Sequence, residues 1–168
     1  MMELILIRHA KSDWGNEYLK DIDRHLSERG YSDAYALSAW YLKEQPLPNL
    51  ILTSTATRAL NTALIFARTL EFNMTDFVIE QTIYESTATN LLALIQQQSN
   101  KKKSIMLFGH NPGITNLFNT LCTDEFFENI PTCGIVKINF EANSWHEISN
   151  QNSKFSFCQF PKNYKNTN

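Results

Sequence analysis

Apolar and polar residues follow two alternating patterns along the first 121 residues of the chain. Short, nearly uninterrupted apolar runs are typical of strands that are covered on both faces, and they occur at residues 4–7, 50–53, 77–79 and 105–108. Between these runs, apolar residues recur at helical spacing over residues 27–41, 55–70, 91–95 and 114–121. Strands that alternate with helices predict an α/β fold, a three-layer α/β/α sandwich with a largely parallel sheet and right-handed crossovers.

Individual residues mark the start of one predicted helix and the apolar face of another. Ser27 is of a residue type that caps helix N-termini, so we expect it to be the N-cap of the first helix. The helix expected over residues 55–70 carries on one face Ala59, Leu60, Ala63, Leu64 and Ala67.

The last third of the chain has a period of two. Apolar and polar residues alternate over residues 135–140, 145–148 and 154–160. This alternation, with short turns, predicts antiparallel C-terminal strands at the edge of the sheet. We therefore expect a single domain over residues 1–162, followed by a polar C-terminal tail over residues 163–168.

Composition and charge limit the classes of partner. The 168 residues are 43% hydrophobic and 19% charged, and the net charge of -2 gives no broad basic surface for nucleic acid. No apolar stretch approaches the roughly 18 residues of a membrane span, so we expect a cytoplasmic protein with no membrane partner. Cys122, Cys133 and Cys158 are scattered along the chain, which fits reduced thiols in a core. The oligomeric state stays open.

Basic residues follow the predicted parallel strands, at the edge where ligands bind in open α/β sheets. A guanidinium is a planar fork for phosphate oxygens, an imidazole is able to attack phosphorus, and helix N-termini add amide donors. These residue types therefore predict phosphoryl chemistry at one edge of the sheet. The residues are Arg8 and His9 after the first strand, Ser54 and Arg58 after the second, and His110 and Asn111 after the fourth.

These residues lie in motifs that resemble those of a known family. The segment Arg8-His9-Ala10-Lys11-Ser12-Asp13-Trp14 resembles the Arg-His-Gly opening of the histidine phosphatase superfamily, in the Arg-His-Ala variant of its SixA-like phosphohistidine phosphatases. Four further stretches agree in order, at residues 23–30, 54–63, 84–85 and 109–113, so that the resemblance spans residues 3 to about 162. His25 and Thr55 replace family prolines. Gly15 stands where mutase-like members have asparagine, which favours the SixA-like branch.

The resemblance implies a phosphoglycerate mutase-like fold and a phosphatase that needs no metal and no other cofactor. His9 would attack phosphorus through an unprotonated nitrogen and form a phosphohistidine enzyme, which water then hydrolyses. Arg8, Arg58 and His110 would hold the phosphoryl oxygens, where charge lies in a loose transition state. The phosphate charge favours a protonated His110, whereas the neighbouring arginines oppose it.

The resemblance implies further roles around this centre. Glu85 is either the acid that protonates the leaving group or an ordinary carboxylate in the first turn of a helix. Ser12, Arg24 and Asn111 are candidates for substrate binding. The expected partner is a phosphorylated substrate, with a phosphohistidine protein as one candidate.

Other functions are compatible with the same residues. A small-molecule phosphomonoesterase or a phosphoglycerate mutase-like enzyme would use the same nucleophile. A noncatalytic module would bind phosphate without turnover. Hydrolysis of an aryl phosphate separates the enzymes from the binding module.

Overall fold

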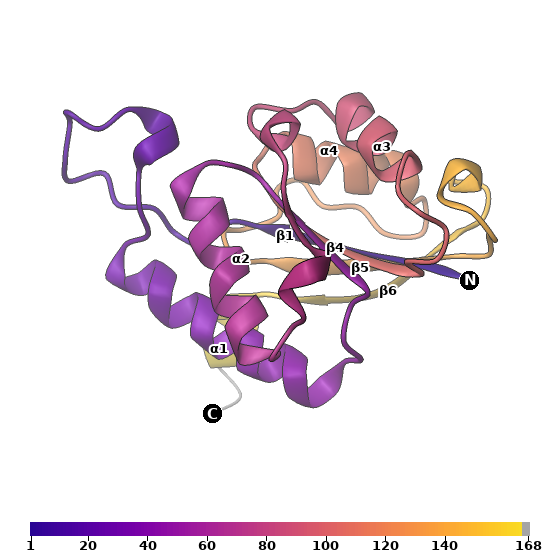
Figure 1. Ribbon diagram of the computed structural model, residues 1–168, viewed down its shortest axis with the longest axis horizontal. Helices are drawn as coiled ribbons and strands as arrows, with labels where there is room; N and C mark the ends of the chain where they lie inside the picture. Colours follow the sequence, from indigo (N-terminus) through magenta and orange to yellow (C-terminus); the bar gives the residue numbers. More distant parts are fainter. Residues whose placement is uncertain (166–168) are drawn as a thin grey trace.

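The computed structural model describes residues 1–165 and shows an α/β fold with a mixed sheet (Figure 1). In chain order the elements are β1 (Met2–Arg8), the 3-10 turn η1 (Asp21–Asp23), α1 (Glu28–Glu44), β2 (Leu50–Thr53), α2 (Thr57–Thr69), η2 (Met74–Asp76), β3 (Phe77–Ile79), η3 (Gln81–Ile83), α3 (Ala88–Gln96), β4 (Ser104–Gly109), α4 (Gly113–Leu121), β5 (Ile135–Phe140), η4 (Trp145–Glu147), β6 (Ser153–Gln159) and α5 (Pro161–Lys165).

The strands form one six-stranded sheet in the order β3-β2-β4-β1-β5-β6. β1 to β4 are parallel, and β5 and β6 are antiparallel to their neighbours, which confirms the predicted mixed sheet. β1 and β4 pair in the middle of the sheet, and Arg8 is the partner of Gly109. The two strands therefore end at the same level, and the next residues, His9 and His110, leave the sheet together.

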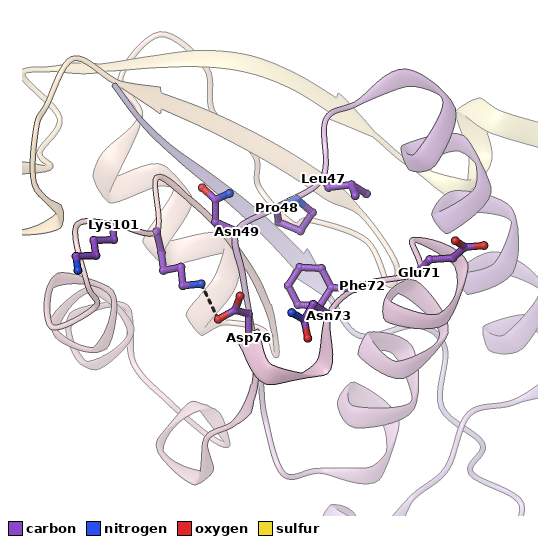
Figure 2. A pocket seen from close by; sticks show the side chains of 9 residues that line it. Leu47, Pro48, Asn49, Glu71, Phe72, Asn73, Asp76 and Lys101 are labelled. Carbon is purple, nitrogen blue, oxygen red and sulfur yellow. Dashed lines mark ion pairs between the residues drawn. The ribbon is translucent and has the colours of Figure 1, made fainter.

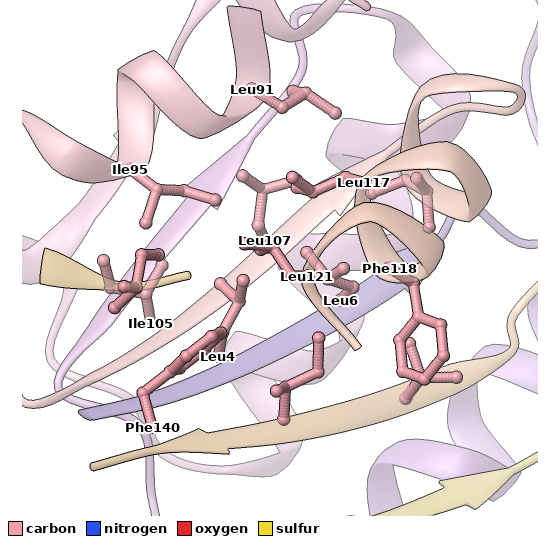
Figure 3. Close-up of a cluster of buried hydrophobic side chains, with 14 of the residues drawn as sticks. Leu4, Leu6, Leu91, Ile95, Ile105, Leu107, Leu117, Phe118, Leu121 and Phe140 are labelled. Carbon is pink, nitrogen blue, oxygen red and sulfur yellow. The ribbon is translucent and has the colours of Figure 1, made fainter. Parts of the chain in front are cut away.

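Helices cover both faces of the sheet, α1 and α2 on one and α3 and α4 on the other (Figure 1). Leu4 and Leu6 of β1 belong to the hydrophobic cluster under α3 and α4, whereas Ile5 and Ile7 belong to the cluster under α1 and α2. Figure 3 shows the first cluster, with Leu4 and Leu6 gathered with Leu117 and Leu121 of α4. Burial on both faces explains the uninterrupted apolar runs of the strands. Packing on both faces fixes the positions of the strand ends that carry the basic residues.

The start of α1 is joined to the chain that leaves β1. Ser27 caps α1 as predicted, because its hydroxyl accepts a hydrogen bond from the Gly30 N–H at 3.1 Å. The same hydroxyl donates to the carbonyl oxygen of Lys11 at 3.1 Å. A Cβ atom on residue 30 would overlap that carbonyl oxygen, so this approach requires glycine. The contact fixes both ends of the loop over residues 10–26, which projects beyond the sheet at the left of Figure 1.

The prediction of a strand at residues 145–148 is wrong, because Trp145–Glu147 form the 3-10 turn η4. The Trp145 side chain is fully buried, and its indole N–H donates to the carbonyl oxygen of Lys102 at 2.7 Å. Because this ring is buried and bonded in place, the chain between β5 and β6 turns at Trp145 and does not form a strand.

The predicted boundaries and apolar face of α2 also need correction. The helix begins at Thr57 and not at residue 55, and Leu64 is 39% exposed. Ala59, Ala63 and Ala67 of the predicted face are buried as expected, and Phe66, which lies outside that face, is fully buried against the sheet.

The described chain continues past the predicted domain boundary at residue 162. Tyr164 of α5 packs against the cluster under α1 and α2. The rest of the predicted tail, residues 166–168, lies outside the described residues. Cys122 and Cys133 are buried, Cys158 is half-buried, and all three are free. Among residues 1–165, the helices lack the length and apolar character that crossing a membrane requires.

Candidate active site

Two histidines meet at the carboxyl edge of the sheet. His9 follows β1 and His110 follows β4, and their ring centroids are 5.1 Å apart. Both side chains are at least nine-tenths hidden from solvent. The sequence placed both residues at strand ends, and the pairing of β1 with β4 brings them together although 100 positions of chain separate them.

His9 presents one nitrogen in an unprotonated form. Its Nδ1 lies 2.7 Å from the carbonyl oxygen of Ala10, which only accepts, so Nδ1 carries the proton. Nε2 therefore has a free electron pair, and it accepts from Nε of Arg58 at 3.3 Å. Burial is the main cause that lowers the pKa of His9 to about 3. At neutral pH the ring is neutral, which is the form that acts as a nucleophile.

Arg58 lies in the first turn of α2, as predicted, and it contacts a residue that the sequence reasoning missed. Nη1 donates to the backbone carbonyl oxygen of Asp21 at 2.6 Å, and Nη2 donates to its Oδ2 at 2.9 Å. The Tyr84 hydroxyl donates to the same Oδ2 at 2.8 Å. Arg58 thus links the nucleophile candidate His9 to the turn η1 of the loop over residues 10–26.

His110 is held by the end of β2. Its Nε2 is 2.8 Å from Oγ of Ser54, whereas its buried Nδ1 has no hydrogen-bond partner among residues 1–165. Burial, followed by the charge of Arg58, lowers the pKa of His110 to about 4. Burial and the neighbouring arginines therefore both oppose protonation, and the ring is neutral at neutral pH. The edge of the Tyr84 ring packs on His110, with centroids 5.6 Å apart.

Arg8 approaches the site from the end of β1. Its Nη1 donates to the carbonyl oxygen of Ile130 at 2.9 Å and to Oδ1 of Asn129 at 3.4 Å. Its buried Nε finds no acceptor in the part of the chain that the structure describes. Burial, with the charge of Arg58 as a second cause, lowers the pKa of Arg8. Two guanidiniums therefore raise the local positive potential beside two neutral imidazoles.

The backbone of the Arg8-His9 pair is held by the loop before β5. The N–H of Cys133 lies 3.0 Å from the carbonyl oxygen of Arg8 and 3.1 Å from that of His9. Cys133 adopts a φ of 60°, in the left-handed region, and its side chain is fully buried. The sequence reasoning assigned Cys133 to the core only, and its role in holding these carbonyls depends on a backbone conformation that residue type does not reveal.

The four remaining candidates differ in their surroundings. Glu85 is exposed at the rim with a φ of 52°, and it lines the cavity beside His110. Ser12 is buried and pairs in an isolated bridge with Leu26. The guanidinium of Arg24 stacks 4.0 Å over the Trp14 ring and lies 3.8 Å from Asp21.

The fourth candidate, Asn111, has both ends of its amide bound within the protein. Its Nδ2 donates to Asn129 and to the carbonyl oxygen of Ile130, and its Oδ1 accepts from Thr115. The amide therefore holds the loops around Arg8 in place and has no donor left for a substrate.

A cavity of about 480 Å³ adjoins His110. Its walls are the segment over residues 85–88, the segment over residues 110–113 and Asn116. Another cavity, of about 340 Å³, lies at the opposite, amino-terminal end of the parallel strands, around Pro48, Phe72 and the Lys102–Asp76 ion pair (Figure 2). None of the predicted site residues lines that second cavity.

Comparisons with known proteins agree with this fold. A model of the histidine phosphatase superfamily (branch 1) matches residues 4–91. An uncharacterized chloroplastic protein of Arabidopsis thaliana is 32% identical over an alignment of 152 positions, which covers 86% of this chain and 69% of that protein. The crystal structure of the "putative phosphohistidine phosphatase SixA" from Agrobacterium tumefaciens superimposes with a TM-score of 0.81 at 26% identity, covering 95% of this chain and 98% of that one. The protein histidine phosphatase SixA complexed with tungstate also gives a TM-score of 0.81, at 18% identity, over 96% of this chain and 99% of that one.

The chain belongs to the histidine phosphatase superfamily. Within it, the chain falls with the SixA-like branch, in agreement with the Arg-His-Ala opening at residues 8–10. Family and neighbours together support a phosphatase enzyme.

Proposed function

We propose that this protein is a metal-independent, SixA-like protein phosphohistidine phosphatase that uses His9 as its nucleophile. The observation that carries the proposal is the geometry of His9, whose Nε2 is unprotonated and lies next to Arg58 and 5.1 Å, ring to ring, from His110. An imidazole that donates from Nδ1 and is unprotonated at Nε2 is prepared for attack on phosphorus once the phosphoryl group displaces the contact with Arg58.

The first step transfers the phosphoryl group to the enzyme. Nε2 of His9 attacks phosphorus in line, the bond from phosphorus to the leaving atom breaks, and a phosphohistidine forms. Buried polar atoms without partners among residues 1–165, Nε of Arg8 and Nδ1 of His110, would be satisfied by the phosphoryl oxygens. Such donors, fixed before the reaction, account for most of the acceleration in phosphoryl transfer.

The second step regenerates the enzyme. Water attacks phosphorus, the bond between phosphorus and Nε2 of His9 breaks, and the orthophosphate that forms keeps both protons of the water and stays bound to the arginines until it is released. The Ala10 carbonyl oxygen holds the His9 proton at Nδ1 in both steps, at 2.7 Å. The nucleophile therefore returns to the same tautomer after each turnover.

The leaving group would lie in the cavity beside His110, where Glu85 is exposed at the rim. Glu85 would protonate an alkoxide as it leaves. An imidazole departs more readily, so a phosphohistidine substrate depends less on this acid. The likeness to SixA structures supports the phosphohistidine substrate.

The experiment that tests the proposal traps the intermediate. Wild-type protein is reacted with a labelled phosphodonor, quenched in alkali and mapped by mass spectrometry. We expect an acid-labile phosphoryl group on His9, no label in His9→Ala, and turnover of an aryl phosphate that a chelator does not change. Label on another residue, or turnover in His9→Ala, would contradict the assignment.

Parallel reactions distinguish the substrate classes. We expect phosphohistidine protein to compete more effectively than small phosphoesters. Preferred hydrolysis of a small ester would favour a phosphomonoesterase, transfer to a second phosphoacceptor would favour a mutase, and binding without label would favour a noncatalytic module.

A further inference from the structure

The guanidinium of Arg58 is shared between the reacting position and a carboxylate of the same chain. Nε of Arg58 faces His9 at 3.3 Å, where phosphorus would react. Nη2 of the same group is bound by Oδ2 of Asp21 at 2.9 Å. A phosphoryl group on His9 would therefore place its negative oxygens on a guanidinium that already carries a carboxylate.

The Asp21 carboxylate is bound firmly enough to compete but remains free to leave. It accepts from both Arg58 and Tyr84, and these bonds hold its pKa below the ordinary value, so it is ionised at neutral pH. The side chain of Asp21 is 48% exposed, whereas that of Arg58 is 10% exposed. If the carboxylate moved away it would be solvated by water, while Arg58 would keep its bond to the backbone oxygen of Asp21.

The position of Asp21 makes such a movement local. It lies in the turn η1 of the loop over residues 10–26, whose two ends are fixed at the contact between Lys11 and Gly30. Rotation of one side chain therefore suffices, and the loop need not open. Two anions on one guanidinium weaken each other's binding, because like charges within a few ångströms repel.

We infer that Asp21 is an internal competitor of the phosphoryl group for Arg58, and that its return to Arg58 promotes the release of orthophosphate at the end of each turnover. The inference rests on the proposed function, since it concerns the same phosphate-binding groups. It assigns to Asp21 a function that adjusts product affinity. Asp21 takes no part in bond breaking.

The chain offers a matched control for this inference. Asp21→Asn removes the charge and keeps an oxygen that accepts from Arg58 and Tyr84. Asp23→Asn removes the same charge two residues later in η1, where the exposed side chain of Asp23 makes no hydrogen bond or ion pair within residues 1–165. A difference between the two variants then reports contact with Arg58 and not the general charge of the loop.

The test measures orthophosphate affinity by titration calorimetry and product inhibition by steady-state assay. We expect Asp21→Asn to bind orthophosphate about tenfold more tightly, with an equal decrease in its inhibition constant, while Asp23→Asn matches wild type. Weaker binding by Asp21→Asn would show that the carboxylate orients Arg58. Equal effects in both variants would show that orthophosphate affinity depends on the overall charge of the loop. Either result overturns the inference.

Binding and turnover are measured separately, so the experiment distinguishes a failure of this inference from a failure of the proposed function. Calorimetry requires no reaction, so tighter binding by Asp21→Asn in a protein that never forms phosphohistidine would reject the proposed function alone. Normal turnover with unchanged orthophosphate affinity would reject the competition alone. Thermal melting of each variant checks that the fold is retained.

Discussion

Nε of Arg58 donates to Nε2 of His9 across 3.3 Å and so joins the start of α2 to the end of β1. The bond directs the unprotonated nitrogen of His9 toward the Arg58 guanidinium, so a donor for a phosphoryl oxygen lies beside that nitrogen. It also explains why Arg58 is almost completely buried although it lies in the first turn of a helix.

Replacement of Arg58 by lysine should lower kcat/KM for an aryl phosphate by about 10²-fold, because lysine supplies a charge without the planar fork or the Nε–H. Steady-state kinetics measures the change. Arg68→Lys, at an exposed position near the end of the same helix, is the control and should retain wild-type activity. An Arg58→Lys enzyme with unchanged kinetics would contradict a role for the guanidinium in holding phosphoryl oxygens.

The two site histidines should stay neutral well below pH 6.5. Burial lowers the pKa of His9 to about 3 and that of His110 to about 4, from an ordinary value of 6.5. Histidine ring signals followed by NMR from pH 7.5 to pH 4.5 should show both rings in the neutral form at pH 5.5. Midpoints near 6.5 for either ring would contradict its buried environment.

The same shifts make the free energy of unfolding depend on pH. Between pH 6.5 and about 4 the unfolded chain binds more protons than the folded chain, so stability is full above 6.5 and falls as the pH is lowered. Each histidine contributes a slope of up to about 1.4 kcal/mol per pH unit. Urea unfolding of His110→Gln should give a shallower slope than wild type in this window. An identical slope would be inconsistent with a neutral, buried His110.

Alanine at position 30 should destabilise the fold by about 3 kcal/mol, the upper end of the usual cost of overpacking. A methyl group there overlaps the backbone carbonyl oxygen of Lys11, which no side-chain rotation relieves. Urea unfolding measures the loss. Gly15→Ala is the control, because its Cβ would meet only a side-chain oxygen of Asp13 at 3.2 Å. Equal stability of the two variants would mean that the α1 contact tolerates a side chain.

Glu85→Gln should separate substrates by their leaving groups. With an alkyl phosphate, whose alkoxide needs a proton, kcat should fall by about 10²-fold. With a phosphohistidine protein it should change less than threefold, because an imidazole leaves readily. Comparable losses on both substrates would assign Glu85 to substrate binding instead of proton donation.

Residues at strand ends were predictable, whereas residues on loops were not. Uninterrupted apolar runs identified strands covered on both faces, and parallel strands share a carboxyl edge, so the sequence assigned His9, Arg58 and His110 to one edge of the sheet. Their contact there depends on the strand order, which the sequence does not give and which places β4 between β1 and β2. Asp21 and Tyr84 lie outside such runs, and their meeting depends on the path of two loops. The only local signals were their positions, two residues before the Asp23-Arg24 motif and directly before Glu85.

The direction of side chains also could not be predicted from the sequence. Asn111 follows a strand as His110 does, but its amide turns into the protein and binds Asn129 and Thr115. Residue type and spacing do not distinguish these two directions. For the same reason the helical pattern predicted that Leu64 is buried, whereas the path of α2 over the sheet leaves it 39% exposed.

Because β1 pairs with β4 at the centre of the sheet, the two histidines lie on the part of the molecule that tolerates least change. Both imidazoles emerge from strands that cannot shift without breaking two hydrophobic layers, whereas the segments over residues 10–26 and 84–90 border the site from the periphery. We expect exchange of those peripheral segments between relatives to change substrate choice and to leave Nε2 of His9 in place.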